Sequence, residues 1–437
     1  MTDLMRKIGA LLLAAMMLFS PEAALRTASA AEVPATATDV ETELTAAPTE
    51  EPTAKPTPEP TPMPPAEDIT QEVAFNGYWG PQGISELRDN RYQTYWTSVR
   101  RSGVCSLTVT APKGKKVGGL LIRWRSWPLA VSIQVPKGDQ WETVTSCDGD
   151  FAAQYIPIPD LQEFRIISRD DDGWSELQIC EITVVTAGSL PEDFQIWRKP
   201  PMKVDMMLIE GHPDDEVLWF GGLLPTYAGE QGKNVLVVNG SFNNYLRRLE
   251  LLDSLWTCGV DIYPVLLNYI DAISWNIEDV YAKWGGRDKV DNDIVKLYRQ
   301  FRPDVVVLHA ENGESGHGAH QVLSDAGRRA VSLAAQKDYD PENVMAYGVW
   351  QVPKVYVHLW EKNRIRMDWH VPLERFGGLD GMAVATMGFE KHLSQQGRAY
   401  SMKEGGETDN SLFGLFYSSV GLDVEKNDMF EHIGDGE

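Results

Sequence analysis

The stretch of sequence that decides the fold reads Val204-Asp205-Met206-Met207-Leu208-Ile209-Glu210-Gly211-His212-Pro213-Asp214-Asp215-Glu216. The apolar run 204–209 predicts a buried strand. The turn after it predicts a helix start, because proline suits a first helical turn and carboxylates favour its positive end. Adjacent helical residues point about 100° apart, so Asp214 and Asp215 cannot both approach one ion equally. One of them can bind a metal ion while the other faces a bound water.

Strands and helices alternate along the chain from this point. The predicted strands are 204–209, 234–238, 262–267 and 304–308, and the predicted helices are 216–231, 246–258, 292–301 and 320–336. Near-continuous apolar strands alternating with helices are typical of a parallel sheet covered on both faces, with ligands outside the carboxyl ends of the strands. We therefore expect a Rossmann-like α/β domain with a mostly parallel sheet over residues 203–437.

A second polar cluster follows the strand 304–308. The glycine-rich loop Asn312-Gly313-Glu314-Ser315-Gly316 leads into His317-Gly318-Ala319-His320, which opens another helix. Histidines three residues apart lie about 5–6 Å apart on one helical face. Two histidines and one aspartate leave open positions on a metal ion, as in catalytic zinc sites, and ferrous iron accepts similar ligands. All eight histidines lie from His212 onward, so we expect the chemistry in this domain.

The residues before the α/β domain divide into three parts. Residues 1–30 combine Arg6 and Lys7 with an apolar run and a small-residue cleavage site, which predicts a signal peptide and a secreted, extracytoplasmic protein. Residues 31–68, rich in threonine, proline and glutamate, predict a disordered linker. Residues 71–188 predict a β-sandwich, because turns separate short β-branched and aromatic runs at 106–110, 118–124, 131–135, 141–145, 164–168 and 180–186.

The charge and cysteine content exclude several classes of protein. Lysine and arginine total 40 against 63 aspartates and glutamates, a formal net charge of -23, which is the wrong sign for binding phosphates. We therefore expect no nucleic acid partner. No later stretch approaches 18 consecutive apolar residues, so we expect no transmembrane helix in the mature protein. The four cysteines lack CxxC spacing, which excludes a zinc ribbon and a thioredoxin-like site.

Residues 203–437 resemble the PIG-L/LmbE family of zinc-dependent N-deacetylases. The motifs that carry this resemblance are Gly211-His212-Pro213-Asp214-Asp215-Glu216, Arg247-Arg248-Leu249-Glu250, Gly316-His317-Gly318-Ala319-His320 and His392-Leu393-Ser394-Gln395. The resemblance implies that zinc is bound by His212, Asp215 and His320. It further implies that Asp214 is the general base and that His317 stabilises the oxyanion or serves as an acid. Candidate substrate contacts are Arg247 and His392.

One departure from the family concerns His317. The family usually carries an aspartate immediately before the second metal histidine, with a proline before that, and this chain has Ala319 and Gly318 there. A carboxylate at that position could orient or charge His317, so its absence puts the protonation of His317 in question. We interpret the remaining central and C-terminal histidines as packing or surface residues, namely His309, His358, His370 and His432.

Residues 71–188 resemble the discoidin (coagulation factor 5/8 type C) family. The resemblance rests on Leu87-Arg88-Asp89, on Thr94-Tyr95-Trp96-Thr97-Ser98 and on Glu176-Leu177-Gln178-Ile179-Cys180-Glu181-Ile182. It implies a jelly-roll-like sandwich that binds a glycan or lipid head group through its end loops. We expect this domain to target the protein, with a glycan as its ligand, while the α/β domain cuts.

These features predict a secreted metal-dependent hydrolase that removes the acetyl group from an N-acetylglucosamine-type sugar or glycan. In this prediction zinc lowers the pKa of a bound water toward about 7, and Asp214 removes its proton. Zinc and protonated His317 then hold the oxyanion. Two alternatives stay open: a secreted glycan-binding or adhesion protein whose last domain is inactive, and an amidase acting on a non-sugar amide.

Overall fold

The computed structural model describes residues 63–77, 83–98, 105–169, 175–241, 244–398, 401–423 and 425–434. The predicted signal peptide (1–30) and the predicted linker up to residue 62 lie outside these residues. The chain from Pro62 to Glu437 clusters as one compact unit that contains three sheets. Within the part that the structure describes, no helix is both long enough and apolar enough to cross a membrane.

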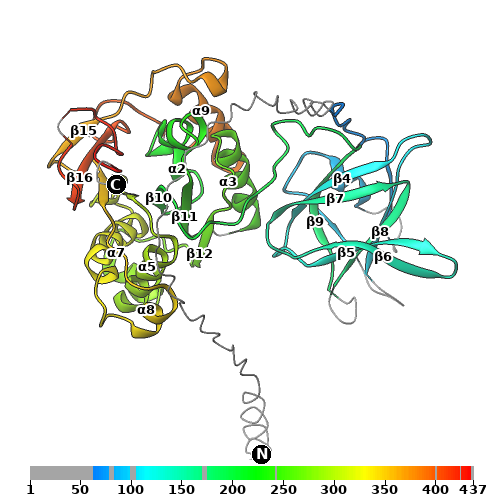
Figure 1. The fold of residues 1–437 in the computed structure, drawn as a ribbon, viewed down its shortest axis with the longest axis horizontal. Coiled ribbons are helices and arrows are strands. Elements are labelled where there is room, and N and C mark those ends of the chain that lie inside the picture. The colour runs from blue at the N-terminus through cyan, green and yellow to red at the C-terminus, as the bar shows by residue number, and fades with distance from the viewer. Residues whose placement is uncertain are drawn as a thin grey trace, which may run out of the picture. The chain divides into compact units, whose positions relative to one another are not determined.

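Two antiparallel sheets make up the β region, which runs from β1 (Ala74–Gly77) to β9 (Gln178–Val185) (Figure 1). One sheet has the strand order β1-β3-β8-β5-β6, and the other has the order β2-β9-β4-β7. Buried apolar residues of both sheets share one hydrophobic core. The other elements are η1 (Ile84–Arg88), β2 (Trp96–Thr97), β3 (Ser106–Thr110), β4 (Val117–Trp124), β5 (Val131–Lys137), β6 (Gln140–Cys147), β7 (Ala153–Leu161) and β8 (Glu163–Ser168).

All six strands predicted in this region are present, but the sequence pattern misses the short strands β1 and β2 and the longer β7. Pro157 and Pro159 interrupt the sequence of β7 and argue against a strand. Among the described strands, β7 pairs with β4 alone and lies at the edge of its sheet. A proline is tolerated at an edge because its missing N–H can face away from the ladder.

A seven-stranded sheet forms the centre of the α/β region, with the strand order β12-β11-β10-β13-β14-β16-β15. The strands from β12 to β14 are parallel, while β16 and β15 are antiparallel at one edge, so the sheet is mostly parallel as predicted. The strands are β10 (Met206–Glu210), β11 (Val235–Ser241), β12 (Val265–Tyr269), β13 (Val305–Leu308), β14 (Lys354–His358), β15 (Arg364–Arg366) and β16 (Leu412–Ser418).

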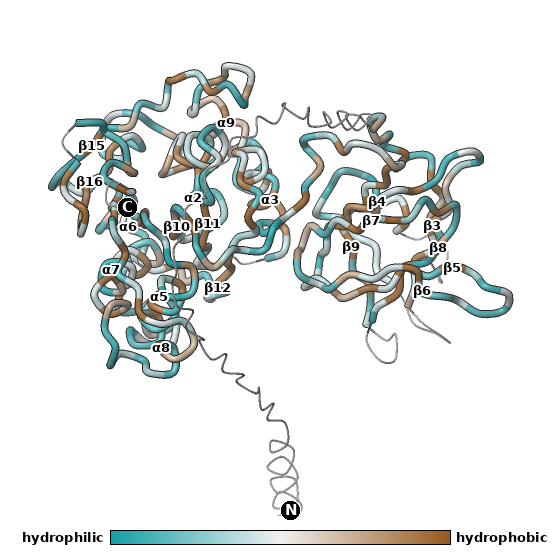
Figure 2. The backbone as a smooth tube through the Cα atoms, viewed as in Figure 1, coloured by the Kyte–Doolittle hydropathy of each residue, from teal (hydrophilic) through white to brown (hydrophobic). Residues whose placement is uncertain are grey.

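Helices cover both faces of this sheet. In β10, Met206 and Leu208 pack in one core with α3 (Tyr245–Thr257), whereas Met207 and Ile209 pack in another with α5 (Arg287–Phe301) and α7 (Gly318–Ala334). The central strands β10 and β11 are correspondingly hydrophobic (Figure 2). The remaining helices are α2 (Asp215–Leu218), η2 (Pro225–Glu230), α4 (Ile277–Lys283), α6 (Gly313–Gly316), α8 (Pro341–Tyr347), η3 (Glu374–Phe376), α9 (Gly381–Glu390) and η4 (Leu393–Gln395).

The predicted helix 216–231 is wrong, because the chain breaks it into two short pieces. α2 ends at Leu218, and the π-helical turn η2 begins at Pro225. Gly221, between them, has a φ of 54°, and a Cβ atom there would lie 2.9 Å from the Trp369 indole nitrogen. This positive φ and the close approach of Trp369 both require glycine. The break therefore lets a bulky side chain pack directly on the backbone.

The helix α3 packs against the β region as well as the central sheet. Arg248 is buried, and its Nη2 donates hydrogen bonds to the carbonyl oxygens of Trp124 (3.1 Å) and Ser126 (2.7 Å) in the β region. Apolar residues from both regions join one core there, among them Leu121, Cys180, Leu251 and Leu255. The two regions therefore share buried surface along α3.

Candidate active site

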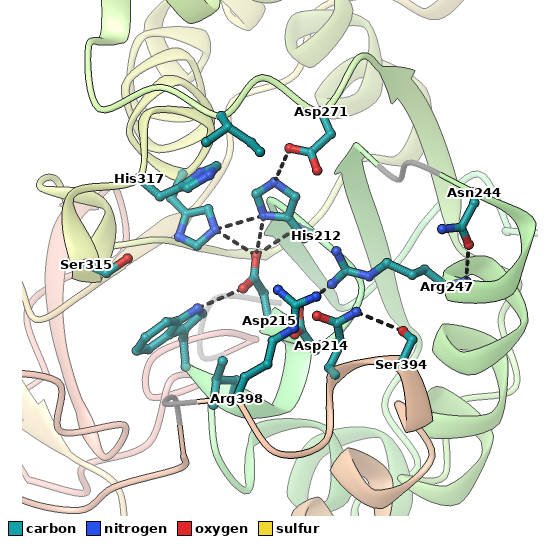
Figure 3. A pocket seen from close by; sticks show the side chains of 15 residues that line it. His212, Asp214, Asp215, Asn244, Arg247, Asp271, Ser315, His317, Ser394 and Arg398 are labelled. Carbon is teal, nitrogen blue, oxygen red and sulfur yellow. Dashed lines mark hydrogen bonds and ion pairs between the residues drawn. The ribbon is translucent and has the colours of Figure 1, made fainter.

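Two polar segments meet at the carboxyl edge of the central sheet. β10 and β13 are parallel neighbours, with Leu208 opposite Val307. The segment after β10 carries His212, and the segment after β13 carries His320, which is 108 residues away in the sequence. Because the carboxyl ends of parallel strands lie at one edge, both segments reach the same place. Figure 3 shows the side chains gathered there.

His212, Asp215 and His320 bring three ligand atoms together. His212 Nδ1 lies 3.0 Å from His320 Nε2, and Asp215 Oδ2 lies 3.0 Å from His320 Nε2 and 3.4 Å from His212 Nδ1. All three residues are buried, and the Trp219 indole N–H donates to the other oxygen of Asp215 at 2.8 Å. Ligands about 2.0–2.1 Å from a tetrahedral ion stand about 3.3 Å apart. The observed spacings therefore fit a zinc ion.

Carboxylates hold the outer nitrogens of both histidines. His212 Nε2 lies 3.4 Å from Asp271 Oδ1, and His320 Nδ1 lies 3.2 Å from Glu314 Oε2. In metal sites the second ring nitrogen of a ligating histidine usually donates to a carboxylate, which fixes the tautomer and directs the other nitrogen at the ion. Both histidines therefore have the outer contacts of metal ligands as well as the inner spacing.

The sequence reasoning misses Asp271 and Glu314. Asp271 follows β12, so its position just after a predicted strand is a signal that could have included it. Glu314 lies inside the glycine-rich loop, but no spacing in the sequence pairs it with His320. Its backbone has a φ of 54°, which a sequence pattern does not reveal in a residue other than glycine.

Glu314 connects three histidines. Its Oε2 also lies 3.0 Å from His309 Nδ1, and its Oε1 lies 2.9 Å from His358 Nδ1. Burial alone would raise the pKa of Glu314, but His309, His320 and His358 outweigh it and hold that pKa well below its usual range. His309 Nε2 accepts the Gly211 N–H at 2.9 Å, so this ring links two segments of the site. His309 Nε2 also lies 3.5 Å from Asp215 Oδ2, and His309, Asp215 and His320 together form a group that could hold a metal ion, so His309 is closer to the site than the predicted packing role implies.

Replacing Glu314 with glutamine is expected to weaken zinc affinity by about 10–100-fold, the usual effect of losing the carboxylate behind a metal histidine. The glutamine amide brings an N–H donor to a place where Glu314 accepts hydrogen bonds from histidine N–H groups, so at least one of these hydrogen bonds is lost. Zinc affinity is measured by competition with a chelating dye. Glu311→Gln is the matched control, because Glu311 lies in the same loop with a side chain 61% exposed, in an ion pair with Arg328. Equal zinc affinity in both variants would contradict the positioning role of Glu314.

Asp214 points away from the ligand cluster. Its Oδ1 accepts a 2.9 Å hydrogen bond from Arg247 Nη2, and its backbone N–H donates to Glu216 Oε2 at 2.8 Å. The two adjacent carboxylates take separate directions, as predicted, but the cause differs. Asp214 is the residue immediately before α2. Its φ of 116° places it outside the helix. Burial and then the charge of Asp215 raise the pKa of Asp214 to about 7, against the opposing effect of Arg247.

His317 faces the same cluster as a neutral ring. Its centroid lies 4.8 Å from that of His212 and 5.0 Å from that of His320. Burial, followed by these two histidines, lowers the pKa of His317 to about 4. Its Nδ1 is buried without a hydrogen-bond partner among the described residues, and the fully buried Ala319 stands where a carboxylate could have met it. The expectation of a protonated His317 therefore does not fit this environment.

The two candidate substrate contacts differ in position. Arg247 lines the pocket, and its guanidinium also contacts the Pro213 carbonyl besides Asp214, so it holds the turn. His392 is fully buried and its Nε2 lies 2.6 Å from Glu216 Oε1. The structure thus gives His392 a buried ion pair with Glu216 in place of the expected substrate contact. The next residues along the chain, Ser394 and Gln395, line the pocket instead.

Three further histidines lie in the core or at the surface, as predicted, namely His358, His370 and His432. His358 is fully buried, and its Nε2 lies 3.1 Å from the Asp409 carbonyl oxygen. His370 and His432 are surface residues, and the two nitrogens of His370 lie 2.9 Å from Asp380 and 2.8 Å from Glu404.

The cluster opens into a pocket of about 510 Å³. Its walls include the polar Asn244, Ser315 and Arg398 (Figure 3). The apolar Leu218 and Ile273 also line it. This size and this mixture of apolar walls with a few convergent polar groups are typical of sites for small molecules. The pocket can therefore bring one sugar or amide group to His212, Asp214 and His317.

Comparison with known proteins agrees with this geometry. Residues 207–331 match the family described as PIG-L: GlcNAc-PI de-N-acetylase. These residues form a PIG-L family domain. The matched stretch contains both polar segments of the site.

A curated relative of the PIG-L domain is the 1D-myo-inositol 2-acetamido-2-deoxy-alpha-D-glucopyranoside deacetylase 1 of Catenulispora acidiphila. It is 28% identical over 179 residues, which cover 35% of this chain and 54% of the relative. A second such deacetylase, from Geodermatophilus obscurus, is 26% identical over 35% of this chain and 60% of its own length. The chain thus spans between half and two thirds of the length of these relatives.

A solved structure similar to this chain is the N,N'-diacetylchitobiose deacetylase from Pyrococcus horikoshii. It is 19% identical with a TM-score of 0.34, and the match covers 45% of this chain and 72% of that one.

Proposed function

We propose that the α/β region is a metal-dependent N-deacetylase that acts on an N-acetylglucosamine-type sugar or glycan. The observation that carries this proposal is the approach of His212 Nδ1, His320 Nε2 and Asp215 Oδ2 to within 3.0–3.4 Å, beside the separately held carboxylate of Asp214. The match to the PIG-L family and the deacetylase names of the curated relatives support the reaction and the sugar class.

The proposed cofactor is Zn²⁺, and Fe²⁺ is the alternative with similar ligands. When bound by His212, Asp215 and His320, such an ion would make water more acidic and polarise the acetyl carbonyl. Asp271 and Glu314 keep the two histidine rings in the required tautomers.

Asp214 moves the proton in this proposal. A pKa of about 7 suits a carboxylate that takes a proton from the attacking water and returns it to the leaving amine. Arg247 binds Oδ1, so Oδ2 is the atom that accepts the proton. The reaction then releases acetate and an amino sugar.

His317 acts as a neutral donor. One ring N–H donates a hydrogen bond to the acetyl oxygen as negative charge develops on it, which stabilises the transition state without an imidazolium. The pKa of about 4 agrees with this form at neutral pH.

Acetate release from a panel of N-acetylated sugars by the purified protein tests the reaction. We expect release that stops when a chelator removes the metal and returns when zinc is added. Hydrolysis of non-sugar amides alone would favour an amidase, and glycan binding without any hydrolysis would favour an adhesion protein.

We also propose a four-part organisation for the whole chain: a signal peptide (1–30), a disordered linker from residue 31, a discoidin-like sandwich with a glycan ligand (71–188) and the deacetylase domain (203–437). The predicted end of the linker at residue 68 is wrong, because Pro65 and Asp68 form β-bridges with Ser189 and Val185. In this proposal the protein is secreted. Mass spectrometry of the protein from culture medium tests the first step, with Ala31 as the expected first residue. Retention of the intact N-terminus, or recovery from the cytoplasm, would contradict it.

A further inference from the structure

The loop between β12 and α4 exposes three large apolar side chains beside the pocket. Ile270 is 72% exposed, Ile273 is 73% exposed and Trp275 is 69% exposed. We call these three side chains the rim. Ile273 lines the pocket, and Asp271, inside the same loop, lies 3.4 Å from His212. Of the three, Ile273 alone lines the pocket, and the other two lie on the same loop. Exposed apolar side chains grouped on one loop next to a pocket mark a binding surface.

The backbone under the rim is firmly held. The Ser274 carbonyl accepts the Gly318 N–H at 2.7 Å, and the Ile270 carbonyl accepts the Trp284 indole N–H at 2.8 Å. Ala272, in the middle of the loop, is buried at 1% exposure. The loop therefore holds the rim in a fixed position before a ligand binds. Ligand binding then needs little further loss of conformational entropy in this loop.

Trp275 lies against the turn that leads to His317. A Cβ atom on Gly316 would lie 3.4 Å from Trp275 Cδ1, and Gly316 directly precedes His317. The indole is thus close to the catalytic end of the pocket. A group attached to the reacting sugar can reach it without leaving the site.

The surroundings of the rim are polar. Asp271, Ser274 and Asn276 alternate with the rim residues along the loop. Beside Trp219 and Ser315, a second cavity of about 400 Å³ has several polar side chains in its lining, namely Ser401, Lys403, Glu407 and Thr408. An acyl chain would need a continuous apolar groove. A pyranose ring, with an apolar C–H face and a hydroxyl edge, matches an isolated indole face among polar groups.

We propose that Trp275, supported by Ile273, binds the sugar ring linked to the reacting N-acetyl sugar. This inference rests on the proposed deacetylase function and narrows its substrate class to a glycan of two or more sugars. Trp275 is in this view a specificity-determining residue, because it contacts the neighbouring ring and leaves the acetyl group to the metal cluster.

Steady-state kinetics on three substrates test the proposal: N-acetylglucosamine, N,N′-diacetylchitobiose and octyl N-acetylglucosaminide. Trp275→Ala is expected to lower the ratio of kcat/KM for the disaccharide to kcat/KM for the monosaccharide by about 10-fold, mainly through KM, as loss of an aromatic contact does. Trp275→Tyr is expected to restore most of the ratio. Met345→Ala is the matched control, since Met345 is 82% exposed on α8, away from the pocket lining.

Three results would overturn the proposal. An unchanged ratio in Trp275→Ala would show that the indole does not contact the second sugar. A larger loss on the octyl glycoside than on the disaccharide would make the rim a site for an apolar aglycone. Both results leave the deacetylase activity standing. If the wild-type protein releases no acetate from any of the three substrates, the proposed function itself fails and the inference fails with it.

Discussion

Replacing Asp214 with asparagine is expected to reduce kcat by about 10²–10⁴-fold while zinc content stays near that of the wild type. Asparagine keeps an oxygen for the 2.9 Å contact with Arg247, so the turn retains its geometry. It cannot take a proton from water, which removes the general base. Acetate release gives kcat, and atomic absorption gives the zinc content of the same sample.

Asp215→Asn is the matched comparison, because it makes the same change one residue along the chain. Asp215 Oδ2 is one of the three proposed ligand atoms, and it also accepts a hydrogen bond from the backbone N–H of His212 at 2.7 Å. We expect this variant to lose zinc and activity together. Loss of zinc from Asp214→Asn, with retention in Asp215→Asn, would mean that the two carboxylates exchange the proposed roles.

The residues of the proposed metal site could be found from the sequence because they follow predicted strands. Apolar runs identify β10 and β13, and parallel strands place the polar residues after them at one edge. Of the two carboxylates behind the proposed ligands, Asp271 could have been included from its place just after a predicted strand. Glu314 could not, because it contacts His320 through a backbone with a positive φ, which the sequence does not reveal.

In the fold, too, the sequence pattern predicts some elements, whereas others depend on packing between distant segments. Periodicity identifies the central strands and the long helices α3, α5 and α7. It fails for the helix at 216–231, where Trp369 from a distant segment packs on Gly221. It also fails for β7, where an edge position makes two prolines acceptable. In each case the deciding contact comes from a residue far away in the sequence.

Arg247 and Arg248 show how far adjacent identical residues can differ. Both lie in the first turn of α3, yet Arg247 holds Asp214 while Arg248 holds the backbone of the β region. The side chains leave a helix about 100° apart, so they face different partners. The sequence named Arg247 alone as a candidate substrate contact, and only tertiary structure shows that the two side chains take different directions.

A shortened chain of residues 203–437 is expected to aggregate, or to unfold at a midpoint at least about 10 °C below that of the mature protein. It lacks the β region and also Phe194 and Trp197, which are buried in the core that α3 completes. Burial of each such aromatic side chain contributes about 1.5–3 kcal/mol, against a total stability of about 5–15 kcal/mol. Size-exclusion chromatography and thermal unfolding measure the outcome. A stable shortened chain with full activity on a soluble N-acetyl sugar would instead support a β region that only targets.

Single substitutions in the whole chain separate this structural role from the effect of deletion. Arg248→Ala leaves the carbonyl oxygens of Trp124 and Ser126 without their buried donor, at a cost of about 1–3 kcal/mol for each unsatisfied group. Arg247, which binds Asp214, precedes Arg248 on α3, so we expect kcat of Arg248→Ala to fall along with the unfolding midpoint. We expect Arg248→Lys to recover only part of the lost kcat and of the lost midpoint. Arg375→Ala, which removes an exposed arginine in η3, is expected to change neither. If the β region serves only as a glycan anchor, Arg248→Ala leaves kcat on a monosaccharide unchanged. If the β region supports α3 and thereby positions Asp214, Arg248→Ala lowers kcat on the same monosaccharide.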